Sequence, residues 1–139
     1  MNKDTKGLHL MIDATCRTSE SIEDKGLLEF VLNRIVGIAG MKSLLPAHMI
    51  EVELDPDKTS GDTDDGGITG VGVLSTSHIS IHTWPLTKRF SFDLYSCRTF
   101  DSERVFKYLD GILGILDAKV TVVERQTPEL ETGIVWKRY

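Results

Sequence analysis

Four side chains that could take part in chemistry lie close together on sequence that favours β-strands. Residues 74–97, LSTSHISIHTWPLTKRFSFDLYSC, contain one candidate nucleophile, two imidazoles and one thiol: Ser77, His78, His82 and Cys97. A hydroxyl, an imidazole and a thiol are the groups that nucleophilic and acid–base catalysis use. The segment therefore indicates a candidate reactive site.

Spacing alone also allows plainer interpretations of these residues. A serine on a strand is usually just polar, and a cysteine near a strand end is commonly a small buried hydrophobic residue. His78 and His82 are four residues apart, so an unbroken strand would place them on one face. Two histidines could bind zinc, but the sequence offers no evident third or fourth ligand, so no metal site is predicted.

The elements that must position these side chains follow from the periodicity of apolar residues. Short apolar or alternating runs predict six strands: 8–15, 48–56 (ended by Pro56), 68–76, 77–84, 89–97 and 118–125. The stretch 55–67, DPDKTSGDTDDGG, is acidic and rich in glycine. It does not have the ligand register of an EF-hand, so we interpret it as a solvated loop.

Two amphipathic helices are predicted between the strands. The first has Thr18 or Ser19 as its N-cap, acidic residues in its early turns and Gly40 at its stop. The second is capped by Asp101 or Ser102. The apolar stripes are formed by residues at helical spacing: Leu28, Val31, Leu32, Ile35 and Ile38 in the first helix, and Val105, Leu109, Ile112, Leu113 and Leu116 in the second.

The predicted order of elements is β-α-β-β-β-β-α-β, which favours an α+β fold. Each amphipathic helix needs one covered face, and a mainly antiparallel sheet with both helices packed on one side provides it. The predicted architecture is thus a two-layer sandwich that forms a single domain over residues 1–139.

Composition narrows the class of protein. The 139 residues are 40% hydrophobic and 27% charged, with a net charge of −5, which argues weakly against a nucleic-acid surface. No apolar run approaches the roughly 20 residues that cross a bilayer, and the N-terminal sequence lacks the apolar region of a signal peptide. Cys16 and Cys97 are too few for a disulfide scaffold. A reducing, cytoplasmic location is therefore expected.

The segment GITGVGVLSTSHISIHTWP, followed by FDLYSC, resembles the prokaryotic S-adenosylmethionine decarboxylases. The family pattern is approximately G-x-[ST]-G-x-x-x-[IL]-S-E-S-H-x-[ST]-[IL]-H-T-W-P-E, with D-x-[FY]-[ST]-C downstream. The match is dense over residues 67–97 and looser at GLHLMIDATC and AKVTVVE. The resemblance implies a pyruvoyl enzyme that is made as a proenzyme and cuts itself.

The resemblance assigns the cut to the peptide between Thr76 and Ser77. The Ser77 hydroxyl would attack the Thr76 carbonyl to form an ester, and β-elimination would then give fragments 1–76 and 77–139. The residue left from Ser77 would become a pyruvoyl group, which forms a Schiff base with the α-amine of a small-molecule substrate. The step requires a bent peptide at the cut, and nearby glycines at 67, 70 and 72 permit unusual backbone angles.

The other site residues are carried over from the same motif. His82 matches the processing base, and Thr69 matches a position that assists the acyl shift. Cys97 matches the cysteine that returns a proton to the substrate α-carbon, and His9 matches a recurrent histidine near the first strand. Strand alternation would place Ser77 and His82 on opposite faces, so the resemblance implies irregular backbone between them.

Two residues that the resemblance places near the substrate depart from the family pattern. Thr76 stands where the family usually has glutamate before the nucleophile, and Leu86 stands where it has glutamate after Trp-Pro. The second glutamate is expected to hold the ribose hydroxyls of the nucleoside, which leucine cannot do. Both departures remove negative charge from the surroundings of a cationic substrate.

Three hypotheses follow for the function. The first is a self-processing decarboxylase of S-adenosylmethionine that feeds polyamine synthesis. The second keeps the pyruvoyl chemistry but acts on ornithine or arginine, because Thr76 and Leu86 leave a ribose unheld. The third is an uncleaved homologue that binds a partner. The resemblance also implies a homodimer of cleaved protomers that share site residues across their interface.

Overall fold

A computed structural model describes residues 7–53 and 66–125, which form one sheet covered by two helices. The strands are β1 (Gly7–Cys16), β2 (Ser43–Val52), β3 (Gly67–Leu74), β4 (Ser77–Trp84), β5 (Arg89–Ser96) and β6 (Ile115–Arg125). The helices are α1 (Lys25–Ile38) and α2 (Ser102–Leu113). The predicted order of elements is confirmed, and so is the predicted α+β sandwich.

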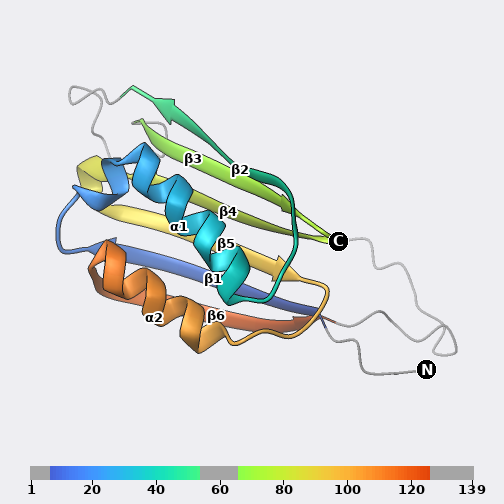
Figure 1. Ribbon diagram of the computed structural model, residues 1–139. Coiled ribbons are helices and arrows are strands. Elements are labelled where there is room, and N and C mark those ends of the chain that lie inside the picture. The colour runs from blue at the N-terminus through green and yellow to red at the C-terminus, as the bar shows by residue number, and fades with distance from the viewer. Residues whose placement is uncertain (1–6, 54–65, 126–139) are drawn as a thin grey trace, which may run out of the picture.

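All five strand pairings are antiparallel, in the sheet order β2-β3-β4-β5-β1-β6. Both helices lie on the same side of this sheet (Figure 1), and α1 contacts β2, β3 and β4 while α2 contacts β6. Among the described residues, neither helix is long and apolar enough to cross a membrane.

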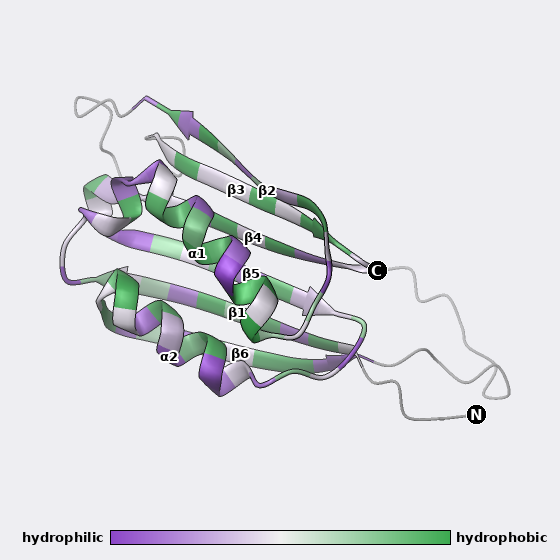
Figure 2. Ribbon diagram, viewed as in Figure 1, coloured by the Kyte–Doolittle hydropathy of each residue, from purple (hydrophilic) through white to green (hydrophobic). Residues whose placement is uncertain are grey.

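Alternation along the strands divides the sheet into a helix-covered face and a helix-free face. In the centre, Leu10 pairs with Leu94, Ile79 pairs with that same leucine, and all three side chains are fully buried beneath the helices. The intervening positions carry polar and aromatic side chains toward the helix-free face, which gives the strands their banded hydropathy (Figure 2). The hydrophobic core thus occupies one side of the sheet, and functional side chains can occupy the other.

The helix ends differ in part from the sequence prediction. Thr18 and Ser19 do not cap α1; a 3-10 turn at Ser21–Glu23 intervenes, and Asp24 accepts the capping hydrogen bond from Leu27 at 2.9 Å. The predicted acidic residues therefore precede the helix, and its first turn contains none. Gly40 follows the C-terminus with φ of 69°, as its predicted role as a stop requires.

The second helix begins as predicted and ends earlier. Asp101 caps α2 by accepting from the Arg104 amide at 3.0 Å. Gly114 then adopts the left-handed conformation, with φ of 64°, and ends the helix. The assignment of Leu116 to the apolar stripe of the helix was therefore wrong, because this residue lies in β6 and its side chain is 62% exposed.

The second predicted strand was placed too late in the chain. β2 begins at Ser43 rather than at 48, and it contains Pro46. A proline is tolerated there because β2 is an edge strand, and its pairing with β3 shifts register between Leu45 and His48. Pro56, most of the acidic loop and the tail at 126–139 lie outside the described residues.

Candidate active site

A tight hairpin turn presents the predicted cleavage point. Leu74 at the end of β3 pairs with Ser77 at the start of β4, so Ser75 and Thr76 form the whole connection. Thr76 has φ of 53°, a left-handed conformation that is unfavourable for a β-branched residue. The backbone is therefore bent and strained at the residue before Ser77, as the sequence prediction required.

The three glycines of this hairpin have different tasks. Gly67, with φ of 145°, adopts backbone angles that other residues rarely reach. Gly70 and Gly72 do not have a positive φ; instead, a Cβ atom at these positions would collide with Met49 or Ile79. The expectation of unusual angles is thus wrong at Gly70 and Gly72. At Gly72 the neighbour is the stiff Ile79 side chain, so close packing favours glycine there, whereas at Gly70 the neighbouring atoms are the flexible end of Met49.

Cys97 lies directly beside the bent peptide. Its backbone N–H donates to Ser77 Oγ at 3.1 Å, and its Sγ is 3.0 Å from Thr76 Oγ1. The hydrogen bond from Thr76 is the largest influence on the Cys97 thiol; with smaller help from Ser77 and Arg98 it outweighs desolvation and holds the pKa below its ordinary value. The turn therefore brings together Thr76, Ser77 and Cys97.

The space at these residues is small. A pocket of about 130 Å³ is lined by the end of the hairpin, the segment after β5 and the segment after α1: Ser75, Ser77, Ser96, Cys97, Arg98, Thr99 and residues 39–42. Sites for ligands of the size of a nucleoside commonly have about 300–1,000 Å³. One uncleaved chain thus provides room for the reacting groups but not for a whole nucleoside.

His82 and Thr69 form a second group at the opposite end of the hairpin. The two residues pair across β3 and β4, and Thr69 Oγ1 is 3.1 Å from His82 Nδ1. A pocket of about 220 Å³ lies beside them, lined also by Val52, residues 66–68, Thr83 and Trp84. The sequence-predicted partners Thr69 and His82 are therefore adjacent.

A single chain does not bring His82 to Ser77. β4 is continuous from Ser77 to Trp84, so the irregular backbone that was expected between the two residues is absent. Five residues of regular strand span roughly 16 Å, and alternation directs the two side chains to opposite faces. Between Leu74 and Trp84, the positive φ occurs at Thr76, one residue before the strand begins.

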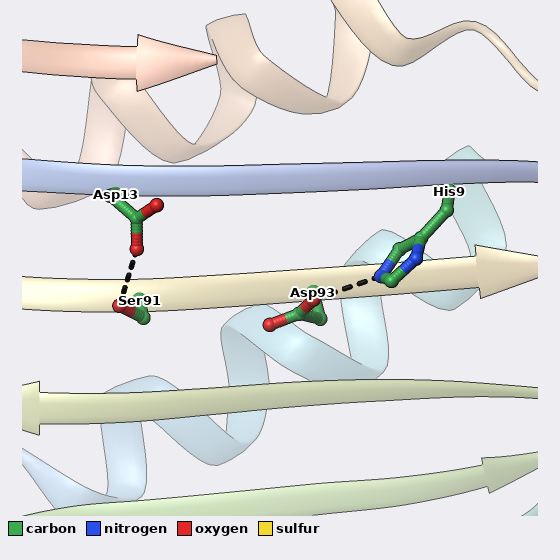
Figure 3. Close-up of polar contacts among 4 residues, drawn as sticks. All are labelled: His9, Asp13, Ser91 and Asp93. Atoms are coloured by element: carbon green, nitrogen blue, oxygen red, sulfur yellow. Dashed lines mark hydrogen bonds and ion pairs between the residues drawn. The ribbon is translucent and has the colours of Figure 1, made fainter. Parts of the chain in front are cut away.

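A polar row on the helix-free face connects β1 with β5 (Figure 3). His9 Nε2 is 2.8 Å from Asp93 Oδ1, and Ser91 Oγ donates to Asp13 Oδ1 at 2.6 Å. The sequence prediction named His9 but missed both carboxylates. Polar residues alternate along both strands, and this pattern could have pointed to the two carboxylates. It does so only when the pairing of β1 with β5 is known, because each strand taken alone does not show which polar side chains become neighbours.

The histidines of this face also contact aromatic side chains. The rings of His9 and His78 lie 6.2 Å and 5.5 Å from the ring of Tyr95, and the Arg125 guanidinium lies 4.7 Å above that ring. His78 and His82 share the helix-free face, as strand spacing predicts. Within residues 7–53 and 66–125, no group of three histidine, cysteine or acidic residues could hold a metal ion.

Leu86 lies next to the His82 end of the site. It occupies a 3-10 turn, Pro85–Thr87, that directly follows β4, and its side chain is 38% exposed. A larger pocket of about 470 Å³ lies near this end, lined by residues of β1, β5 and β6 together with Trp84, but none of the reacting groups lines it. We therefore locate the candidate active site from its chemistry rather than from cavity size.

Comparisons with known proteins show the family to which the chain is related. A family model described as S-adenosylmethionine decarboxylase matches residues 8–126. The S-adenosylmethionine decarboxylase proenzyme of Persephonella marina is 32% identical over 115 residues, which are 83% of this chain and 76% of that protein. The protein of the same name from a Hydrogenobaculum species is 30% identical over 112 residues, or 81% of this chain and 73% of that protein.

A solved structure extends the agreement to the fold. The crystal structure of the adenosylmethionine decarboxylase from Aquifex aeolicus VF5 matches with a TM-score of 0.69 and 26% identity, covering 90% of this chain and 94% of that one. Fold and sequence define a decarboxylase of the class that is made as a proenzyme. The chain belongs to the S-adenosylmethionine decarboxylase family. These findings favour S-adenosylmethionine over ornithine or arginine as the substrate class.

Proposed function

We propose that this chain is a self-processing decarboxylase that converts S-adenosylmethionine to its decarboxylated form and CO2. The observation that carries the proposal is the hairpin turn, where a left-handed Thr76 precedes Ser77 and the Cys97 thiol lies within hydrogen-bond distance. Membership of the family supplies the reaction class, and these three residues supply the groups that the reaction needs.

Cleavage begins with the Ser77 hydroxyl in this proposal. Its oxygen forms a bond to the Thr76 carbonyl carbon while the amide C–N bond breaks and the Ser77 nitrogen takes up a proton. Removal of the Ser77 α-proton then breaks the Cβ–O bond, and Thr76 leaves with a carboxylate as the end of fragment 1–76. The dehydroalanine left at position 77 tautomerises to an imine, and water hydrolyses the imine to a keto group with release of the nitrogen as ammonia. The bent backbone at Thr76 favours the first step because it removes the peptide from a relaxed strand conformation.

The residues around Ser77 fit the pyruvoyl group that would begin fragment 77–139. In that group the keto oxygen would take the place of the Ser77 nitrogen and the former Cβ would become a methyl group, so it needs no more room than the serine. The Cys97 N–H, which lies 3.1 Å from Ser77 Oγ, faces the oxygen that leaves with the Thr76 carboxylate. The group supplies a carbonyl that reacts with the substrate amine and withdraws electrons from the α-carbon. The role of this chain's own thiol, at Cys97 Sγ, is to hold a proton beside that carbon and deliver it after CO2 leaves.

A homodimer completes the site in this proposal. Within one chain His82 cannot reach Ser77, whereas a second copy laid across the helix-free face in the opposite direction would bring its Thr69–His82 pair toward the Cys97 end. That face also carries exposed apolar side chains on β2 and β3: Ile50, Val52, Val71 and Val73. Burial of such a patch between two copies stabilises a dimer.

The proposal includes a cytoplasmic location, which the chemistry of the cysteines supports. Cys16 and Cys97 are both free thiols, and a catalytic thiol is preserved in a reducing compartment.

Intact-mass measurement combined with release of labelled CO2 tests the function. Purified protein is expected to contain two fragments, 1–76 and 77–139, the second with the mass of a pyruvoyl terminus, and to release CO2 from carboxyl-labelled S-adenosylmethionine. The Ser77→Ala variant serves as the control, which should stay uncleaved and inactive. An intact, folded wild-type chain would overturn the enzymatic proposal, and cleaved protein active only on ornithine or arginine would overturn the substrate.

A further inference from the structure

The Thr76 hydroxyl has two hydrogen-bond partners but only one proton. Its Oγ1 lies 3.0 Å from Cys97 Sγ and 2.7 Å from the carbonyl oxygen of Ser75. A hydroxyl donates one hydrogen bond and can accept two. When Thr76 donates to the Ser75 carbonyl, its contact with sulfur must therefore be one in which the thiol donates.

This arrangement suits either protonation state of Cys97. A neutral thiol donates its proton to Thr76 Oγ1 while the hydroxyl donates to Ser75. A thiolate instead accepts a hydrogen bond from the hydroxyl, after a rotation of the O–H group about the Cβ–Oγ1 bond that leaves the heavy atoms in place. Cys97 can thus lose and regain a proton without moving its sulfur.

We propose that Thr76 is a positioning residue for Cys97, whose hydroxyl holds the sulfur in place through both protonation states of the thiol. This inference rests on the proposed function, in which Cys97 delivers a proton. It assigns Thr76 a task beyond its place in the cleaved peptide. The contact also spans the cut, since Thr76 belongs to one fragment and Cys97 to the other.

The shift of the Cys97 pKa to a lower value agrees with this geometry. The Thr76 hydroxyl is the main reason that the pKa of the thiol lies below its ordinary value. Cys16 offers a contrast within the same chain, because its side chain is 2% exposed and burial raises the pKa of its thiol. The two cysteines are therefore expected to react with an alkylating reagent at different rates and with different dependence on pH.

The test uses the Ser77→Ala background, so that every variant remains uncleaved and the readout does not depend on activity. The rate of alkylation of Cys97 by iodoacetamide is measured against pH by peptide mass spectrometry, with Cys16 as the internal reference. We compare this background with added Thr76→Ala, Thr76→Val and Thr76→Ser. Loss of the hydroxyl is expected to move the midpoint to higher pH and to slow alkylation at neutral pH about threefold or more.

Thr76→Ser keeps the hydroxyl and is expected to restore the original pH profile. The inference is overturned if the alanine and valine variants retain the pH midpoint of the background, or if serine shifts the midpoint as far as they do. Both Thr76→Ala and Thr76→Val are used because alanine fits a left-handed turn with less strain than valine. A shift of the pH midpoint seen in both variants is then due to loss of the hydroxyl and not to misfolding of one of them. Since no variant cleaves, the result is independent of whether the wild-type chain processes itself.

Discussion

At the scale of single residues, the register of two neighbouring strands brings a hydroxyl and a thiol together. Ser77 and Cys97 meet because β4 begins where β5 ends, and pairing of His78 with Tyr95 fixes that register. His82 was predicted as the base for the same Ser77, but a motif of consecutive letters contains no information about how far apart the folded strand holds two side chains. The distance between His82 and Ser77 appears only once the strand is seen to be regular.

The substrate-binding role predicted for Leu86 can be tested by restoring a carboxylate. Leu86→Glu should lower KM for S-adenosylmethionine about tenfold or more, because a charged acceptor for a hydroxyl is worth about 1.5–3 kcal/mol. Leu86→Gln is the matched control, since it accepts hydrogen bonds without charge and should give a smaller change. Steady-state measurement of CO2 release decides the matter. An unchanged KM in both variants would mean that this position does not contact the ribose.

The Thr69–His82 hydrogen bond gives a second prediction at this scale. Thr69→Val removes the hydroxyl that lies 3.1 Å from His82 Nδ1 and should slow cleavage, whereas Thr69→Ser should cleave at nearly the wild-type rate. Intact-mass spectra recorded over time after synthesis give the two rates. Equal cleavage of the valine and wild-type chains would remove Thr69 from the processing machinery.

At the scale of elements, the fold was predictable because local signals agree with the global arrangement. Alternation located the β3, β4 and β5 strands, and the Asp101 cap located the start of α2. The predicted start of β2 and the predicted cap of α1 were wrong for physical reasons that do not lie in the local sequence. β2 can extend through Pro46 because no described strand pairs with its outer edge. Asp24 rather than Ser19 caps α1 because a 3-10 turn at Ser21–Glu23 lies between Ser19 and the start of the helix.

Gly72 tests the packing of the hairpin against the core. A Cβ atom there would lie 2.7 Å from Ile79 Cγ2, whose side chain is fully buried and stiff, so Gly72→Ala should cost about 1–3 kcal/mol of unfolding free energy. Gly37→Ala in α1 is the control, because nothing lies within 4 Å of its Cβ, and it should stabilise by about 0.5–1 kcal/mol. Urea denaturation of both changes in the uncleaved Ser77→Ala chain provides the measurement. A neutral Gly72→Ala variant would contradict the tight packing.

At the scale of the whole molecule, Cys97 and His82 lie in two separate groups of site residues. This separation allows a test of whether a dimer shares its sites between protomers. Cys97→Ala and His82→Ala protomers should each form an inactive dimer. If sites are shared across the interface, a mixed dimer contains one site with both residues intact. Random mixing should then restore about one quarter of the wild-type activity, measured as CO2 release from co-expressed, purified protein. No recovery, with mixed dimers present by mass spectrometry, would place each site within one protomer.

The sheet order has a consequence for the proposed cut between Thr76 and Ser77. Strands β1, β2 and β3 belong to residues 1–76 and β4, β5 and β6 to residues 77–139, so in the order β2-β3-β4-β5-β1-β6 the two pieces interdigitate. Three seams of backbone hydrogen bonds, β3 to β4, β5 to β1 and β1 to β6, join one piece to the other. The proposed cut at the turn would therefore break one covalent bond while these hydrogen bonds hold both fragments in a single sheet, so that the chemistry at position 77 would change without separation of the two pieces.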